Sequence, residues 1–149
     1  KGCLSTWRDA LARFCWEGRM EEVLPEVYVD GAHNISAVEG FVQSVPGDKR
    51  NIIVFSAVQD KDYEKMIAFL CRNLETDFYM VTPIKDKRAV SVQSLQRVFQ
   101  KYTEKPVFAR ESLGEALTFV LERREGRRVF CLGSLYLTGM IKSLIKEAV

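Results

Sequence analysis

Apolar residues follow two patterns along this chain. Some form short unbroken runs, and others recur at every third or fourth position over longer stretches. The short runs predict strands and the spaced patterns predict helices. Strands are predicted at 21–24, 27–29, 51–55, 78–82, 106–109 and 129–132. Helices are predicted at 35–45, 63–74, 92–102, 113–121 and 135–145, with a weaker helical pattern at 4–14.

From residue 27 onward, each predicted strand is followed by a predicted helix. This alternation indicates right-handed βαβ crossovers and a mostly parallel sheet with helices on both faces. The run at 51–55 is apolar without alternation, which is typical of a strand covered on both faces. The sequence therefore predicts an α/β fold with three layers, α/β/α.

In such a sheet the turns from strand to helix share the carboxyl edge, where ligands bind. The polar and charged side chains of these turns are therefore the candidate contacts of a functional site. They are Asp30, His33, Asp60, Asp62, Arg88 and Ser134.

The turn Asp30-Gly31-Ala32-His33-Asn34 lies between the strand at 27–29 and the next helix. Gly31 tolerates the backbone angles of a sharp turn, and Asn34 is a good helix N-cap. The exposed N–H groups of a helix start favour anions, so this turn is a candidate phosphate site. The alternative is structural: Asp30 caps backbone N–H groups, and His33, the single histidine, is a hydrogen-bonded surface residue.

Composition narrows the function further. The chain has 149 residues, enough for one domain, and its net charge of +2 gives no field that implies nucleic acid or a membrane surface. Since we find no apolar run of bilayer length and no signal peptide, we expect a cytoplasmic protein. The four cysteines form no CxxC pair, so we expect free thiols and no metal site at them.

Nucleotide-binding motifs are absent from the sequence. No GxGxxG follows the first strand, and no GxxxxGK[ST] occurs anywhere in the chain. The domain therefore lacks the usual loop for holding a triphosphate by itself. One alternative is a non-catalytic nucleotide-binding or regulatory α/β module. A receiver domain would need a phosphorylated aspartate at the end of its third strand, but the third run here ends with Thr82-Pro83.

Four motifs resemble the C-terminal domain of folylpolyglutamate synthase, within the Mur ligase family, and follow the family's order. They are Trp16-Glu17-Gly18-Arg19-Met20-Glu21, Asp30-Gly31-Ala32-His33-Asn34, Asp60-Lys61-Asp62-Tyr63 and Gly133-Ser134-Leu135-Tyr136-Leu137. Two departures occur: Glu17 and Ile35 each stand where the family commonly has proline.

The resemblance implies a Rossmann-like sheet of about six strands with the first strand antiparallel. It implies one domain over 1–149, with 1–15 a linker or tail from an N-terminal ATPase domain. The full enzyme would use ATP and Mg²⁺ to join L-glutamate to folate through an acyl phosphate, with the Mg²⁺ ligands mainly on the ATPase domain. We expect a monomer that is inactive as this fragment alone.

By the same resemblance, Arg19, Asp30 and His33 would bind ATP, and His33 and Ser134 would bind glutamate. His33 and Asp30 are the expected catalytic residues. A guanidinium neutralises phosphate charge, while a hydroxyl or imidazole orients a carboxylate. The motifs do not separate a glutamate-adding synthase from one that is also a dihydrofolate synthase, because the pterin site would lie on the ATPase domain.

Overall fold

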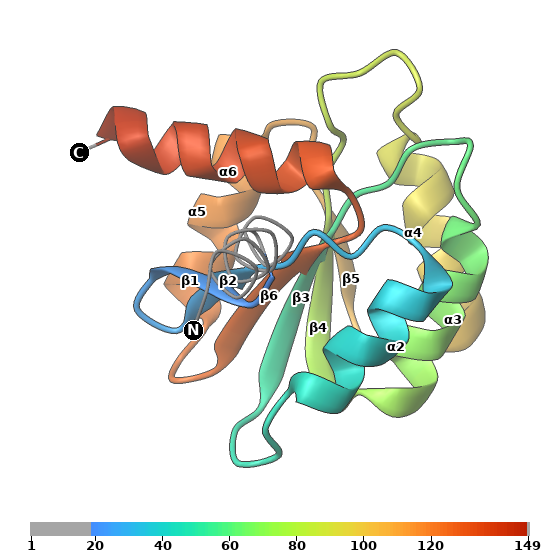
Figure 1. Cartoon of the computed structure of the whole chain (residues 1–149), viewed down its shortest axis with the longest axis horizontal. Coiled ribbons are helices and arrows are strands. Elements are labelled where there is room, and N and C mark those ends of the chain that lie inside the picture. Colours follow the sequence, from blue (N-terminus) through green and yellow to red (C-terminus); the bar gives the residue numbers. More distant parts are fainter. Residues whose placement is uncertain (1–18, 149) are drawn as a thin grey trace, which may run out of the picture.

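The computed structural model describes residues 19–148, and Figure 1 shows their arrangement. The weak helical pattern at 4–14, the proposed linker at 1–15, the first three residues of the Trp16 motif, Cys3 and Cys15 lie outside these residues. Along the described chain the elements follow the predicted order. They are β1 (Glu21–Leu24), β2 (Val27–Val29), α2 (Ile35–Ser44), β3 (Asn51–Phe55), α3 (Tyr63–Asn73), β4 (Thr76–Val81), α4 (Val92–Tyr102), β5 (Val107–Ala109), α5 (Leu113–Arg123), β6 (Arg128–Leu132) and α6 (Leu135–Ala148).

The six strands form one sheet in the order β1-β2-β6-β3-β4-β5. β1 pairs with β2 antiparallel, whereas the other neighbours are all parallel. The expected six-stranded, mostly parallel sheet with an antiparallel first strand is confirmed. β6, the last strand in sequence, lies between β2 and β3, so the connection through α5 returns across the sheet.

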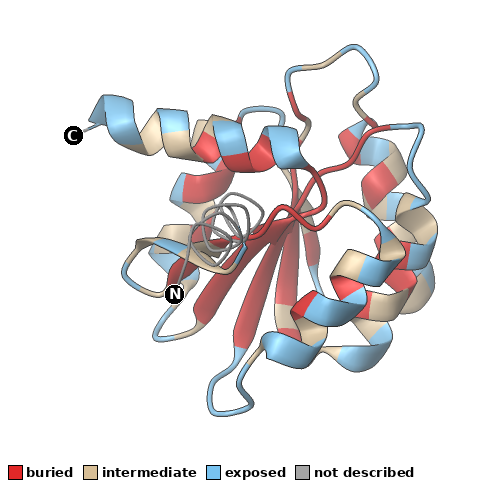
Figure 2. Cartoon of the chain, viewed as in Figure 1, coloured by how far each residue is buried: buried red, intermediate tan, exposed pale blue. Residues whose placement is uncertain are grey.

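Helices cover both faces of the sheet, as the predicted layers require (Figure 1). On one face, α2, α3 and α4 pack against Ile53, Phe55, Tyr79 and Phe130 of the strands. On the other face, α5 and α6 pack against the strand residues that alternate with these, including Ile52, Val54 and Cys131. Because successive strand residues point to opposite faces, the unbroken apolar run of β3 supplies both cores at once. Buried positions accordingly concentrate in the strands (Figure 2).

Side chains fix the starts of four helices. Each N-cap side chain accepts a hydrogen bond from the backbone N–H three residues further on, which satisfies a donor that the helix leaves free. These caps are Asn34, Asp62, Ser91 and Ser112 for α2, α3, α4 and α5. The predicted capping role of Asn34 is therefore confirmed, and Asp62, a candidate functional contact, serves as a helix cap.

Two strands begin earlier in the structure than the pattern predicts. β4 begins at Thr76, because Thr76 pairs with Asn51 at the amino edge of the sheet, where polar residues are tolerated. β6 begins at Arg128, which pairs with the same Asn51. Backbone pairing therefore extends each strand into residues that periodicity assigns to a loop. Along the part of the chain that is described, none of the helices has the length and apolarity needed to cross a bilayer.

Candidate functional site

The candidate site lies at the carboxyl ends of β2 and β6, where two neighbouring strands continue in opposite directions. The chain leaves β2 for α2 on one face, and leaves β6 for α6 on the other. In open α/β sheets, ligands bind outside the carboxyl ends of the strands at such a reversal. The backbone N–H of Gly133 donates to the carbonyl of Ala32 at 3.0 Å, which joins the two loops directly.

Gly133 permits the close approach of these loops to the end of β3. Its φ is +112°, and a Cβ at this position would lie 2.0 Å from the carbonyl oxygen of Ser56. Only glycine fits such a position without displacing backbone. Gly133 therefore sets the path by which the chain leaves β6 and reaches Ser134.

Asp30 is a buried carboxylate with 2% of its surface exposed. Its Oδ1 accepts from the backbone N–H of Ala32 at 2.8 Å, and its Oδ2 accepts from that of Met20 at 3.2 Å. Burial raises the pKa of Asp30, while these two hydrogen bonds and the charge of Arg19 work in the opposite direction. Asp30 thus holds both its own turn and the segment that enters β1.

Arg19 adjoins the segment that this carboxylate holds. Its side chain is exposed, and it immediately precedes Met20, which has a left-handed φ of 49° and is bound by Asp30. Asp30 therefore holds the residue next to Arg19, and the charge of Arg19 acts to lower the pKa of Asp30. The structure therefore brings together two of the residues expected to bind nucleotide.

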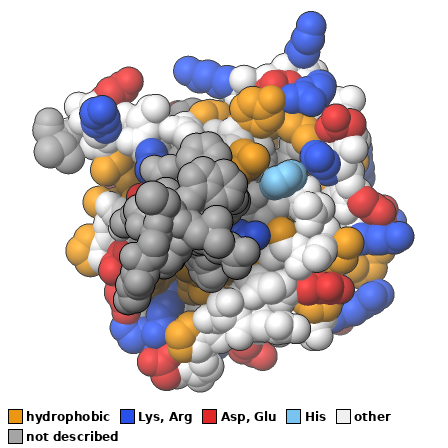
Figure 3. All heavy atoms as spheres, viewed as in Figure 1, with side chains coloured by type: hydrophobic (Ala, Val, Ile, Leu, Met, Phe, Trp, Pro, Cys, Tyr) orange, Lys and Arg blue, Asp and Glu red, His pale blue; other side chains and the backbone are white. Residues whose placement is uncertain are grey.

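His33 is half-buried, and Figure 3 shows the single histidine at the surface of this face. Its Nδ1 lies 2.8 Å from the carbonyl oxygen of Gly31. Because a carbonyl only accepts, Nδ1 carries the proton, and Nε2 of the neutral ring is left with a lone pair. The turn therefore fixes both the tautomer and the orientation of the imidazole.

Ser134 is buried at the start of α6, with 3% of its surface exposed. Its Oγ accepts from the backbone N–H of Tyr136 at 3.0 Å, which leaves the hydroxyl proton available to a ligand. Asp30 and Ser134 lie at the same edge of the sheet, as the sequence predicts, because β2 and β6 are parallel neighbours.

The remaining candidates lie further along the same edge. Arg88 pairs with Asp60 at 3.4 Å and with Asp86 at 3.0 Å, and it donates to the hydroxyl of Tyr136 at 2.7 Å. Asp62 caps α3 and pairs with Lys65. Sequence reasoning assigned no role to Tyr136 or Gly133, although both lie in the Gly133–Leu137 motif.

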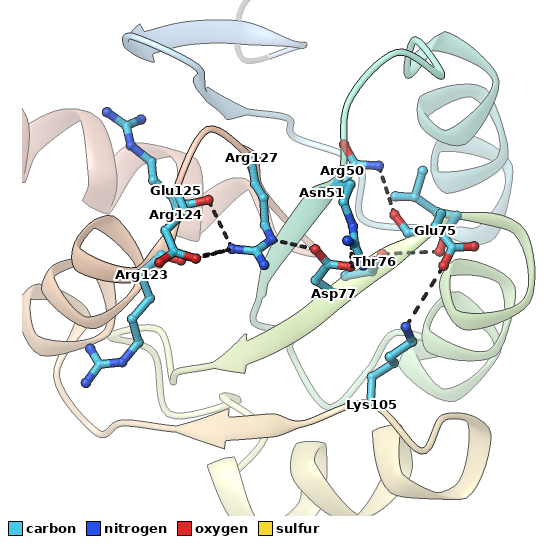
Figure 4. A network of polar contacts seen from close by, with 11 residues as sticks. Arg50, Asn51, Glu75, Thr76, Asp77, Lys105, Arg123, Arg124, Glu125 and Arg127 are labelled. Atoms are coloured by element: carbon cyan, nitrogen blue, oxygen red, sulfur yellow. Dashed lines mark hydrogen bonds and ion pairs between the residues drawn. The ribbon is translucent and has the colours of Figure 1, made fainter.

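A second charged network lies at the opposite, amino edge of the sheet. Asp77 is paired with Arg50 and Arg127, and Glu75 faces Lys105 (Figure 4). These residues tie the starts of β3 and β4 to the α5–β6 connection, so their role is structural. Across residues 19–148, no group of three or more His, Cys, Asp or Glu side chains is placed to hold a metal ion.

Fold and site together define a Rossmann-like domain whose ligand edge is built from an Asp-Gly-Ala-His-Asn turn and a Gly-Ser helix start. Residues 18–135 match the model of the Mur ligase, glutamate ligase domain. The chain therefore belongs to this family.

Individual relatives agree with this assignment. The chain is 40% identical over 74 residues, 46% of its length and 16% of the relative, to the dihydrofolate synthase/folylpolyglutamate synthase of Bacillus subtilis (strain 168). A Mycobacterium tuberculosis folylpolyglutamate synthase complexed with ADP has a similar fold (TM-score 0.76, 24% identity, 86% of this chain and 32% of that chain). Another similar structure is the Thermotoga maritima folylpolyglutamate synthase (TM-score 0.69, 25% identity, 89% and 31%). The chain thus spans about a third of each solved relative.

Proposed function

We propose that this chain is the C-terminal domain of an ATP-dependent ligase that adds L-glutamate to folate. The observation that carries the proposal is the family's Asp30–Asn34 turn, positioned beside Ser134 where the neighbouring strands β2 and β6 end. The names of the relatives support the same reaction, and ADP in the M. tuberculosis structure supports the use of ATP. An N-terminal ATPase domain supplies the phosphate-binding loop and the Mg²⁺ ligands, and the reaction takes place in the cytoplasm.

In this reaction the terminal carboxylate of folate takes the γ-phosphoryl group of ATP, which yields an acyl phosphate and ADP. The amino group of glutamate then attacks the acyl carbon, phosphate leaves, and the amine loses a proton. The free Nε2 of His33 is suited to accept that proton or to orient the reacting groups. The Ser134 hydroxyl is suited to donate to a carboxylate of the glutamate.

Arg19 and Asp30 are assigned to the nucleotide. The guanidinium of Arg19 offsets phosphate charge. A carboxylate repels phosphate, so Asp30 meets ATP at a hydroxyl or amino donor, using lone pairs that its two backbone hydrogen bonds leave free. It also acts on the site indirectly, because it holds the turn that orients His33.

Steady-state kinetics of the full-length enzyme test this proposal. We expect ADP formation that depends on both folate and glutamate. His33→Ala lowers kcat/KM by about 100-fold or more without changing the melting temperature, since a positioned charge-stabilising group contributes about 2.7–4 kcal/mol to the transition state. Asp30→Ala lowers kcat/KM similarly and also lowers stability, because the N–H groups of Ala32 and Met20 lose their acceptor.

Asn34→Ala is the matched control in the same turn. Asn34 caps α2 through the N–H of Ala37 at 2.8 Å, so its loss costs about 1 kcal/mol of stability and leaves turnover per folded molecule nearly unchanged. If His33→Ala behaves like Asn34→Ala, the turn only supports the fold and the assigned role of His33 is wrong. If the protein binds nucleotide but forms no ADP in response to folate and glutamate, it is instead a nucleotide-binding regulatory module.

A further inference from the structure

Tyr136 lies on the first turn of α6, two residues after Ser134. Among the described residues, it and Leu135 are the large apolar side chains that remain exposed, with 47% of Tyr136 accessible. Its side chain lines a groove of about 930 Å³ that opens between α6, the loop after β4 and the start of α5. That volume suits a small-molecule site, so the face of Tyr136 is accessible to a substrate.

Arg88 holds Tyr136 from the loop after β4. Its guanidinium carbon lies 5.6 Å from the centre of the tyrosine ring, and Nη2 donates to the phenolic oxygen at 2.7 Å. The loop itself is tied to the end of β3, because Gln59 N–H donates to the Arg88 carbonyl at 2.7 Å and Val90 N–H donates to that of Ala57 at 3.0 Å. Arg88 therefore connects a fixed loop to the start of α6.

The charge on Arg88 is already neutralised. Asp86 accepts from Nε at 3.0 Å and from Nη2 at 3.4 Å, and Asp60 accepts from Nη1 at 3.4 Å. With two carboxylates bound, the guanidinium is a poor site for a further anion. Its position over Tyr136 indicates that it orients the tyrosine.

The phenolic hydroxyl of Tyr136 keeps its own proton for a ligand. Since its oxygen accepts from a guanidinium, which is a pure donor, the O–H remains free to donate. The backbone N–H of the same residue donates to Ser134 Oγ at 3.0 Å. One short turn thus joins two hydroxyl groups whose protons are both available.

We propose that Tyr136 is a further substrate-binding residue of the ligase, donating its O–H to a carboxylate of the incoming amino acid, and that Arg88 is the positioning residue that holds it. The proposal rests on the proposed function, since it assigns the amino-acid substrate to the Ser134 side of the site. Neutral O–H donors suit a dicarboxylate, because they satisfy its oxygens while the ligand's own amino group stays free to react.

The test measures KM for glutamate, KM for ATP and kcat in the full-length enzyme. Tyr136→Phe removes the hydroxyl and keeps the ring, and we expect KM for glutamate to rise about 10- to 100-fold, the value of one hydrogen bond to a charged group. KM for ATP and kcat stay within about twofold, because the lost contact binds ground and transition states equally. Arg88→Ala has the same effect on KM for glutamate, and the double variant is no worse than either alone, because Arg88 acts through Tyr136.

The chain provides a matched control pair far from this turn. The Arg72 guanidinium lies 5.3 Å from the centre of the Tyr102 ring on the α3–α4 layer, and the Tyr102 hydroxyl binds Glu64. Tyr102→Phe and Arg72→Ala leave KM for glutamate unchanged. Thermal melts of all variants report folding.

Three outcomes overturn the inference or part of it, and they can be distinguished. If the wild-type enzyme forms no glutamate-dependent ADP, the proposed function fails and the inference fails with it. If the wild-type enzyme is active and Tyr136→Phe keeps its KM for glutamate, only the inference fails. Additive effects of Arg88→Ala and Tyr136→Phe overturn the positioning role of Arg88.

Discussion

At the scale of single residues, the pKa values of two carboxylates at the ends of the strands, Asp30 and Asp77, are shifted in opposite directions. Burial raises the pKa of Asp30, because two backbone N–H groups only partly replace its water. Burial acts in the same direction on Asp77, but its hydrogen bonds and ion pairs with Arg127 and Arg50 outweigh it and lower the pKa. The first carboxylate lies at the carboxyl edge of the sheet, and the second stabilises the fold at the opposite edge.

The lowered pKa of Asp77 predicts a pH-dependent contribution to stability. Its ionised form is favoured in the fold, so the contribution is present above the unfolded pKa of about 3.9 and is lost as the pH falls through the lower folded value. We expect Asp77→Asn to lower the free energy of unfolding by about 1.5–3 kcal/mol at pH 7. Denaturant unfolding of variant and wild type at pH 7 and pH 3 measures the difference.

The gap between the two proteins should shrink at pH 3. Glu75→Gln is the control, since Glu75 is a largely exposed partner of Lys105, and its loss should change stability little at either pH. A gap for Asp77→Asn that stays constant with pH contradicts a stabilising role for its charge.

At the scale of elements, the path of the chain after β6 determines where the site forms. Gly133 lets the end of β6 pass against the end of β3, and the N–H of Gly133 then reaches the Ala32 carbonyl. α6 therefore begins beside the Asp30–Asn34 turn. An element boundary, more than any single polar group, places Ser134 near His33.

We expect Gly133→Ala to destabilise the domain by about 3 kcal/mol or more. The new Cβ meets the Ser56 carbonyl, and alanine does not tolerate the left-handed backbone at this position. Gly139→Ala, one turn along α6, adds a Cβ with nothing within 4 Å and should stabilise the helix by about 0.5–1 kcal/mol. Urea unfolding of the two variants tests the pair, and equal effects contradict the close approach at Gly133.

At the scale of the whole molecule, the proposed function requires the described domain to provide only one wall of the site. The carboxyl edge offers an imidazole, hydroxyl groups and Arg19, but the sequence contains no phosphate-cradling loop. The solved relatives are about three times as long as this chain. Under the proposed function, the nucleotide is shared with the ATPase domain.

The 149-residue chain by itself should therefore bind ATP weakly and release no ADP in the presence of folate and glutamate. Isothermal titration measures the first property and a coupled ADP assay the second. The full-length enzyme is the positive control under the same conditions. If this chain alone releases ADP in response to folate and glutamate, the proposal that the site is shared with an ATPase domain is wrong.

Much of this architecture is determined by the sequence alone. The run Asn51–Phe55 is apolar on both faces, and the stripes that follow each strand have helical spacing, so element order and layers follow from local patterns. Asn34 also caps α2 as its residue type predicts, because capping involves only groups three residues apart. These features depend on neighbours in sequence, and periodicity encodes them.

Tertiary structure decided the rest. Periodicity shows which face of a strand is buried but not which strand lies beside it, so only the fold places β6 between β2 and β3 and brings Ser134 to the Asp30 turn. The burial of Asp30 and the contact of Arg88 with Tyr136, 48 residues apart, likewise arise from long-range packing. Such contacts depend on strand order and loop path, which are set by hydrogen bonds and side-chain fit across the whole domain.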